Sequence, residues 1–435
     1  MMHNKLQRQY LKLAAFPLAL LFLFCSKNPA SSQPGQVAII ATDPGVTDAR
    51  LIIEMRDTQD PAQIALLRDG VEVYRDSTNS LETTTVFDST LQPNHAYTYK
   101  AVLYQDGHQT TASSTINITT MDTTSHSFSW EVFSFGEGSG SQLNDVFIVN
   151  RNNIWAVGKI HVKDSTGNFI IPHFNAVHWD GQEWELVRFY KSSSSIISRI
   201  RGICHFSNSN IWLGAGSIYH WEGNLATLSY QREIYTLETV ERLWRQSESE
   251  IYGVGNAGLM VYYNGRGWQT LESNTTLPIK DIWGAVDPLD NEQIILSVAA
   301  EKLGHSDKKI IQINPQNQTT SEVEWPFQNK KLHSVWFNRK SHIWVCGSGA
   351  YLYRGNTWKR FNELPPYFLN RIRGNDINDL FVVGDFGMVA HFNGINWKVF
   401  PEVNFALYHS LDYKDDIMVA VGQQNGRGYL LKMVR

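Results

Sequence analysis

Between Asp379 and Phe400 the chain reads DLFVVGDFGMVAHFNGINWKVF, and near-copies of this stretch occur throughout the second part of the sequence. Its first element, a hydrophobic run ending in glycine, returns as NIWAVG, NIWLGAG, EIYGVG, HIWVCG and DIMVAVG. Most copies continue with a short strand and an Asp-Gly or Asn-Gly pair, which suits the positive φ angles of tight two-residue turns. A tryptophan commonly follows that glycine by three residues: Trp184, Trp268, Trp358 and Trp397. The stretch is therefore a repeated structural unit.

Another short strand precedes each glycine-ending run, so a complete unit has four strands and returns after about 40 residues. Four-stranded units at this period are typical of a β-propeller, and counting them predicts seven blades. The strand-ending glycines predict a bulge or a close approach of backbone at that point. We therefore expect an all-β chain with a seven-bladed propeller over residues 127–435.

The two ends of the repeat region predict how the ring closes. The last unit stops at GYLLKMVR without a tryptophan-bearing outer strand, whereas SFSWEVFSF lies just before the first unit. Its WEVF matches the WKVF that begins at Trp397. We expect this N-terminal strand, within residues 127–135, to complete the last blade and so remove the open sheet edges.

The repeats resemble those of secreted bacterial propellers with VWG, VWAVG and HWDGxxW motifs, which often occur on lipoproteins. The resemblance covers residues 127–435. It implies the propeller fold and leaves the function open, because propellers host many unrelated activities.

Residues 36–121 have the pattern of a separate all-β module, with short Val-, Ile-, Thr- and Tyr-rich runs between turn residues. The segment LQPNHAYTYKAVLY resembles the corner and F strand of fibronectin type III domains, through Leu91, Pro93 and Tyr97. This resemblance implies a β-sandwich ahead of the propeller, with the Tyr97 hydroxyl bonded to the preceding backbone.

The N-terminus has the composition of an export signal. Basic residues in MMHNKLQRQYLKL precede the short apolar run AAFPLALLFLF, and Cys25 follows directly. Residues 1–25 resemble a bacterial lipoprotein signal, which implies a lipid anchor on Cys25, and residues 26–36 form a Ser/Pro-rich tether. The alternative is an ordinary cleaved signal with an incidental cysteine. An exported protein of the cell envelope, at the outer membrane or cell surface, is expected.

Composition and motifs argue against several classes of function. A net charge of -4 on 435 residues disfavours binding of nucleic acid. The repeated histidines His178, His220 and His391 occupy equivalent places in different blades, so we expect them to pack in the fold and not to form a metal site. The sequence has no GxSxG, HExxH or P-loop motif. We expect no catalytic residue, no metal and no cofactor, and a sialidase-like hydrolase is the least favoured alternative.

Candidate binding residues lie in the connections between repeats, which differ in length and composition. They should share one face of the disc, where rigid scaffolds commonly carry their binding loops. Aromatic residues and arginine are typical of protein interfaces and also suit sugar stacking. The candidates are Tyr190, Lys191, Tyr230, Arg232, Tyr235, Tyr367 and Phe368, with His161, Lys163 and His305 nearby.

A second candidate is an inner-strand position that holds Arg201 and Arg373 where other repeats have tryptophan. One interpretation is a cationic mouth that binds an anionic ligand. The favoured interpretation is ion pairing with acids of the channel, such as Asp145 and Asp281.

The sequence as a whole predicts a monomeric, lipid-anchored protein whose propeller binds a protein or a glycan at the cell surface. The alternative is a scaffold or assembly factor of an envelope complex.

Overall fold

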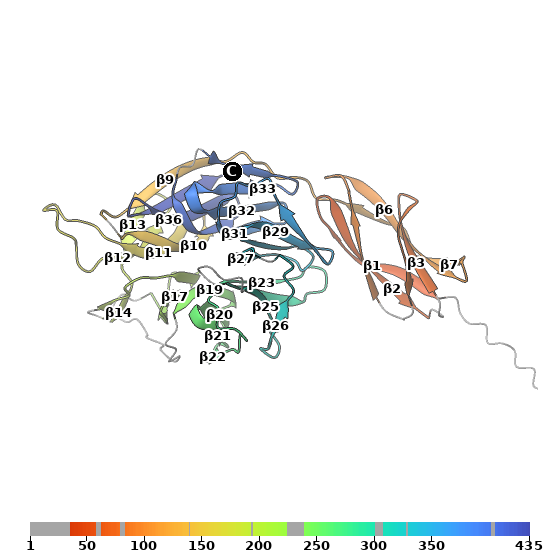
Figure 1. Cartoon of the computed structure of the whole chain (residues 1–435), viewed down its shortest axis with the longest axis horizontal. Coiled ribbons are helices and arrows are strands. Elements are labelled where there is room, and N and C mark those ends of the chain that lie inside the picture. The colour runs from red at the N-terminus through yellow and green to blue at the C-terminus, as the bar shows by residue number, and fades with distance from the viewer. Residues whose placement is uncertain are drawn as a thin grey trace, which may run out of the picture.

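A computed structural model of the chain describes residues 35–57, 62–78, 83–138, 140–192, 195–223, 239–300, 308–327, 329–401 and 405–435. These residues form a β-sandwich followed by a β-propeller, which lie side by side (Figure 1). The only helical elements among them are two 3-10 turns, η1 (Asn256–Gly258) and η2 (Asp385–Gly387). Within this described part of the chain, no helix is long and apolar enough to cross a membrane.

The sandwich consists of two antiparallel sheets around one apolar core. Its first sheet has the order β1 (Gln36–Pro44), β2 (Asp48–Arg56), β5 (Thr83–Ser89). The second has the order β4 (Val71–Thr78), β3 (Ala62–Arg68), β6 (Ala96–Gln105), β7 (His108–Ala112), and β8 (Ile116–Thr119) also pairs with β6. Tyr97, Tyr99, Ala101 and Leu103 alternate along β6 into this core. The predicted tyrosine contact is confirmed, because the backbone N–H of Gln92 donates to the Tyr97 hydroxyl at 2.8 Å.

The remaining sheets, which we call blades 1 to 7, follow one another along the propeller. Blade 1 is β10 (Gln142–Asn150), β11 (Asn153–Ile160), β12 (Phe174–Trp179) and β13 (Trp184–Val187). The described strands of blade 2 are β16 (Gly202–Ser207), β17 (Asn210–Ala215) and β18 (Ser217–Trp221). A short ribbon, β14 (Tyr190–Ser192) with β15 (Ser195–Ile196), lies between these two blades in sequence.

Blades 3 to 6 each have four strands in sequence order, from inner to outer. Blade 3 is β19 (Val240–Ser247), β20 (Glu250–Gly255), β21 (Met260–Tyr263) and β22 (Trp268–Thr270), and blade 4 is β23 (Ile279–Val286), β24 (Gln293–Ala300), β25 (Lys308–Ile313) and β26 (Thr320–Val323). Blade 5 is β27 (Leu332–Trp336), β28 (Ile343–Gly347), β29 (Gly349–Arg354) and β30 (Thr357–Phe361). Blade 6 is β31 (Leu369–Asp376), β32 (Asp379–Gly384), β33 (Val389–Phe392) and β34 (Trp397–Val399).

Blade 7 confirms the predicted closure of the ring. Its inner three strands are β35 (Leu407–Lys414), β36 (Ile417–Gln424) and β37 (Arg427–Val434), and its outer strand is β9 (Ser129–Phe135). Strand β9 pairs with β37 from Ser129↔Val434 to Phe135↔Gly428. The first and last segments of the propeller are thereby joined in one sheet.

Apolar clusters lie between successive blades, and the repeated tryptophans help to form them. Trp184 of blade 1 lies 5.8 Å, between ring centroids, from Phe133 of β9 in blade 7. Trp268 of blade 3 lies 5.6 Å from Trp212 of blade 2, and Trp397 contacts an aromatic ring of blade 5 in the same way. The outer-strand tryptophans therefore pack one blade against the preceding blade, as the sequence pattern predicts.

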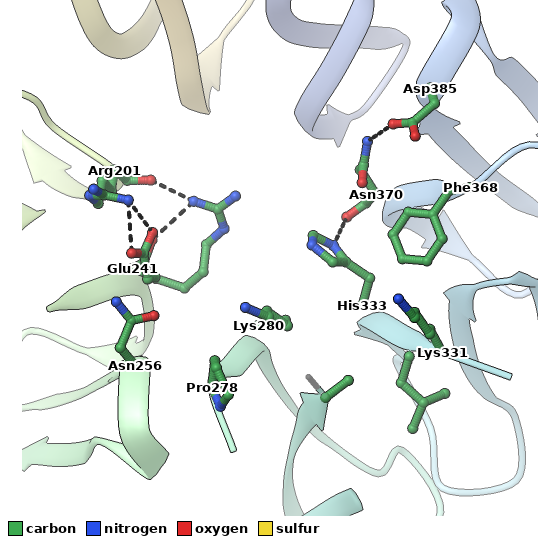
Figure 2. Close-up of a pocket in the computed structure, with 13 residues that line it drawn as sticks. Arg201, Glu241, Asn256, Pro278, Lys280, Lys331, His333, Phe368, Asn370 and Asp385 are labelled. Carbon is green, nitrogen blue, oxygen red and sulfur yellow. Dashed lines mark hydrogen bonds and ion pairs between the residues drawn. The ribbon is translucent and has the colours of Figure 1, made fainter. Parts of the chain in front are cut away.

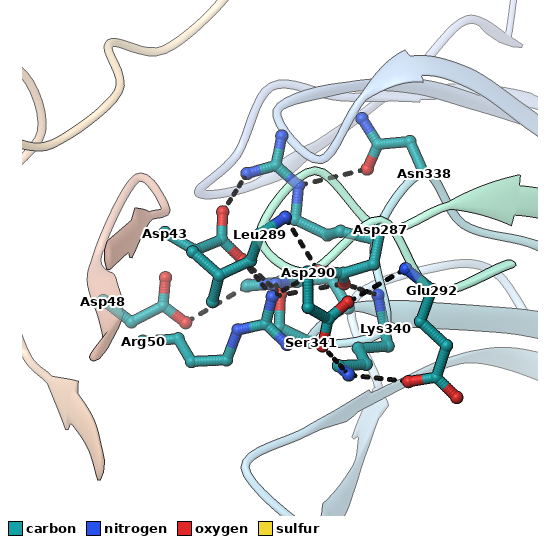
Figure 3. Close-up of polar contacts among 12 residues, drawn as sticks. Asp43, Asp48, Arg50, Asp287, Leu289, Asp290, Glu292, Asn338, Lys340 and Ser341 are labelled. Carbon is teal, nitrogen blue, oxygen red and sulfur yellow. Dashed lines mark hydrogen bonds and ion pairs between the residues drawn. The ribbon is translucent and has the colours of Figure 1, made fainter. Parts of the chain in front are cut away.

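The sandwich is attached to blades 4 and 5 by a buried ionic contact (Figure 3). Nη2 of Arg50, on β2, donates to both carboxylate oxygens of Asp287 at 2.8 and 3.1 Å, and these side chains are 5% and 0% exposed. In the opposite direction, Asp43 of β1 accepts from Arg339 Nη1 at 2.7 Å and from Ser341 Oγ at 2.9 Å. Each part thus contributes an arginine and an aspartate to the contact, which fixes the position of the sandwich relative to the propeller.

Two neighbouring residues of β9 test the closing strand. Phe133 faces the core and contacts Trp184, whereas Val132 is 40% exposed. We expect Phe133→Ala to lower the free energy of unfolding by about 2 kcal/mol, below the cost for a fully buried phenylalanine because this ring is only half-buried. Val132→Ala should stay within about 0.5 kcal/mol of wild type. Urea denaturation measures both, and equal effects would contradict the packing of this strand.

Two arginines of β2 test the contact between sandwich and propeller. Arg50→Ala leaves Asp287 buried without its cation, which should cost about 3–5 kcal/mol and separate the melting of the two parts in scanning calorimetry. Arg56, whose side chain is 66% exposed beside Glu54, is the matched control. Its change to alanine should leave the melting profile unchanged. An unchanged profile for Arg50→Ala would show that the contact does not hold the two parts together.

Candidate functional site

The repeated histidines lie on the third strands of blades 1, 2 and 6: His178, His220 and His391. His178 stacks on Trp155 with ring centroids 4.1 Å apart, and its Nε2 lies 3.0 Å from Oδ1 of Asn153. In blade 2, His220 stacks on Trp212 in the same way, with ring centroids 4.1 Å apart. These contacts confirm the packing interpretation. In the described part of the chain, no three His, Cys, Asp or Glu side chains are placed to hold a metal ion.

A recurring bulge shapes the inner strands. In blade 1 the pairing of β10 with β11 shifts between Leu143 and Asp145, opposite Gly158, and blade 6 repeats this opposite Gly384. A Cβ at Gly158 would lie 2.1 Å from a backbone oxygen of the inner strand, and at Gly384 the distance would be 2.0 Å. The predicted close approach is thus confirmed, and it explains why the second strand ends in glycine.

In every blade except blade 2, the bulge brings a polar side chain to the start of the inner strand. The residues at the shift, which we call the bulge ring, are Asn144, Glu241, Lys280, His333, Asn370 and His409. The residues that follow them are Asp145, Arg242, Asp281, Ser334, Arg371 and Ser410. Two rings of polar residues therefore surround the channel of the propeller.

A cavity of about 680 Å³, which we call mouth A, opens at the bulge ring (Figure 2). Its lining residues come from the starts of inner strands and the ends of second strands, so it lies on the face of the connections between blades. Its charged and polar lining includes Arg201, Glu241, Arg242, Lys280, Lys331, His333, Asn370 and Asp385, with Phe368 beside them. Four cations and two carboxylates make this mouth positive.

Several of the polar groups in mouth A are paired. Nη1 of Arg201 donates to both carboxylate oxygens of Glu241, at 2.8 and 3.0 Å. Nδ2 of Asn370 donates to Asp385 at 2.9 Å, and Nδ1 of His333 donates to the Asn370 carbonyl at 2.7 Å. Burial and the positive charges around His333 lower its pKa to about 3, so its imidazole is neutral at pH 7.

A second cavity of about 390 Å³, mouth B, lies at the other end of the channel and includes Arg373. Arg373 donates to both oxygens of Asp281 at 2.9 Å, and Arg371 is bonded to the same carboxylate. Burial alone would raise the pKa of Asp281, but the two guanidinium groups hold it well below its usual range.

The structure therefore places Arg201 and Arg373 at different mouths and does not bring them together. Both form ion pairs, as the favoured interpretation expects, although Glu241 and not Asp145 is the partner of Arg201. A single cationic mouth containing both arginines is not what the structure shows.

The loop candidates are also separated. Phe368 lines mouth A, and Tyr367 beside it is 41% exposed. Tyr190 and Lys191 lie on β14 and line neither mouth. Cys25, Tyr230, Arg232 and Tyr235 lie outside the described residues.

Two exposed aromatic residues next to mouth A were not among the sequence candidates. Phe386, in η2, is 66% exposed, and its ring centroid lies 5.3 Å from that of Tyr367. Phe405 is 80% exposed, and Gly387 N–H donates to the Ala406 carbonyl at 2.7 Å, which ties these loops together. We call Tyr367, Phe386 and Phe405 the aromatic patch. Phe386 has a φ of 56°, and Ala257 has a φ of 50° at the equivalent place in η1, so this backbone angle belongs to the turn that both blades share. The large ring at this place is what distinguishes blade 6.

Asp281 provides a test of the channel network. Asp281→Asn leaves two buried guanidinium groups without their carboxylate, so the free energy of unfolding at pH 7 should fall by about 3–5 kcal/mol. Because the folded-state pKa of Asp281 is lowered, its stabilisation is present above the unfolded pKa of about 4 and is lost as the pH falls below that value. The variant should therefore vary less in stability between about pH 5 and pH 2.

Asp416→Asn, which removes a surface partner of Arg151, is the control for this measurement and should change stability by less than about 1 kcal/mol. Urea midpoints measured across the pH range decide the matter. Parallel pH profiles for wild type and Asp281→Asn would contradict the assigned role of Asp281.

Comparison with known proteins supports the fold. No protein-family model matches the chain, and no curated protein sequence matches it significantly. Two solved structures are similar: YCF48 bound to a D1 peptide, with a TM-score of 0.53, and the WD40 β-propeller domain of Doa1, with a TM-score of 0.50. Each shares 14% sequence identity and covers 70% of this chain, with 97% and 96% of the other chain covered. At this identity the likeness establishes the fold alone, and the chain is a β-propeller protein.

Proposed function

We propose that this protein is a non-catalytic binding protein of the cell envelope, whose propeller binds a protein partner through the aromatic patch beside mouth A. The observation that carries the proposal is the contact between the exposed rings of Tyr367 and Phe386, on loops that are hydrogen-bonded to each other. Large aromatic side chains on a rigid frame are the residues that contribute most to protein interfaces.

The position of the patch supports the same proposal. The ring of Phe386 contributes little to the core because it is 66% exposed. The adjoining residues Phe368 and Asp385 line mouth A, so a bound segment could contact the patch and the polar mouth together.

The similarity to a propeller with a bound peptide is consistent with this proposal, although the shared identity is only 14%. That structure provides an example of the fold used for peptide binding. A partner of the present chain must be established on its own residues.

The sequence supports the location that we propose. Cys25 directly follows an apolar signal-like segment, so a lipid anchor on Cys25 would attach the chain to a membrane. We also propose that the sandwich is fibronectin type III-like, which the Tyr97 contact supports, and that it acts as a fixed spacer between anchor and propeller. The seven sheets of the ring support a seven-bladed propeller, which we propose functions as a monomer.

Two alternatives concern the partner. A glycan could stack on the same exposed rings, and an assembly factor of an envelope complex would use the same face on a partner in its own membrane. The identity of the ligand that the patch binds distinguishes both alternatives from the main proposal: a glycan indicates the first, and a protein of the same membrane indicates the second.

The proposal is tested by binding of the purified protein to arrays of envelope proteins, peptides and glycans, followed by affinity measurement. We expect a protein or peptide ligand, with affinity reduced at least about tenfold by the double change Tyr367→Ser and Phe386→Ser, because truncation of central aromatic residues commonly costs more than 1 kcal/mol each.

The control for this experiment is Arg151→Ala, in the turn between β10 and β11 on the opposite face, which should leave affinity unchanged. Affinity that survives the double change would contradict the proposed surface. A ligand found only among the glycans would replace the protein partner by the glycan alternative.

A further inference from the structure

Arg242 occupies a special place in the channel. Among the residues that the structure describes, Arg242 alone lines both mouth A and mouth B. Its Nη1 donates to two backbone carbonyls, those of Arg201 at 2.6 Å and of Glu241 at 3.0 Å. Its Nε is buried without a hydrogen-bond partner. The fold therefore leaves part of the hydrogen-bonding capacity of this guanidinium unused.

The carboxylates of the channel are already bonded to other groups. Asp281 binds Arg371 and Arg373, and Glu241 binds Arg201. Among the described residues, Arg242 forms no ion pair with a carboxylate. Arg242 is half-buried, and its charge is compensated only by backbone carbonyls and by carboxylates that are bonded to other groups.

Charges of both signs surround Arg242. Burial and the charge of Arg371 lower the pKa of Arg242 to about 10, against the opposing effect of Asp145, Asp281 and Glu241, and the group remains charged at pH 7. Burial, Arg242 and Arg199 lower the pKa of His409 to about 4, and the buried Nε2 of that neutral histidine also has no partner. The channel thus contains two buried polar atoms without a hydrogen-bond partner.

We propose that mouth A binds a carboxylate ligand, which is held by the guanidinium of Arg242 and by the net positive charge of the mouth. A guanidinium forms strong, charge-assisted hydrogen bonds with carboxylate oxygens. The cavity, of about 680 Å³, has room for more than the carboxylate itself. The site is separate from the aromatic patch, and the carboxylate could belong to a small free acid or to the partner that the patch binds.

The test uses isothermal titration calorimetry and thermal melting of the purified protein. The probes are sodium succinate, with sodium chloride at equal ionic strength as the reference, and a peptide with a free C-terminal carboxylate alongside its amidated form. We expect succinate, the free-acid peptide or both to bind and to raise the melting temperature. Succinate binding indicates a small free acid, whereas binding of the free-acid peptide alone indicates a carboxylate of a protein partner.

The decisive variant is Arg242→Met, which keeps the length of the side chain and removes its charge. We expect carboxylate affinity to fall on the order of 10- to 100-fold, the range for loss of charged hydrogen bonds. Without ligand, the variant should melt close to the wild-type temperature, because it loses two hydrogen bonds to backbone carbonyls and also the desolvation cost of a half-buried charge. Arg266→Met, an exposed arginine of the same blade, should match wild type in both measurements.

Three outcomes would overturn the site. No binding of either probe to wild type would do so, as would binding that Arg242→Met retains. An equal loss of melting temperature in Arg242→Met with and without succinate would assign Arg242 a structural role only. The variant with Tyr367→Ser and Phe386→Ser should still bind succinate, so failure of the carboxylate site and failure of the aromatic patch are distinguishable.

Discussion

The pairing of β9 with β37 is the constraint on which the propeller depends. It joins Ser129–Phe135 to the last strand of the chain and gives the final blade its outer strand. Each blade packs its apolar face on the next, so an incomplete blade would expose both its own edge and the face of its neighbour. Closure also fixes the arrangement of the inner strands around the axis of the propeller. The polar channel is therefore a consequence of a contact at the rim of the ring.

The channel combines structural and binding roles in the same residue types. Inner-strand aspartates hold consecutive blades together: Asp145 accepts from Ile203 N–H at 3.2 Å, and Asp412 accepts from Ile148 N–H at 2.7 Å. Arg371 and Arg373 are used in the same way, as partners of the buried carboxylate of Asp281. Arg242 differs from them, because its hydrogen bonds go to backbone carbonyls and its Nε has no partner. A group that the fold leaves unsatisfied is a better candidate for binding than one that the fold uses.

The sandwich adds a second constraint, on orientation. Arg50 and Arg339 each cross the boundary between the two parts to reach a buried aspartate, so the sandwich does not hang freely from the propeller. The sandwich therefore keeps one orientation relative to the face that carries mouth A and the aromatic patch.

The sequence by itself determined the features that repeat. Glycine-ending strands, turn pairs and spaced tryptophans predicted the propeller, the closing strand and the packing role of the histidines, because each blade repeats the same local geometry. The tertiary structure alone decided which non-repeating side chains meet. It placed Arg201 and Arg373 at opposite mouths and brought Phe386 to Tyr367. Among the residues that the structure describes, it left Arg242 without an ion pair to a carboxylate. These relations join different blades across the ring, and local periodicity carries no information about them.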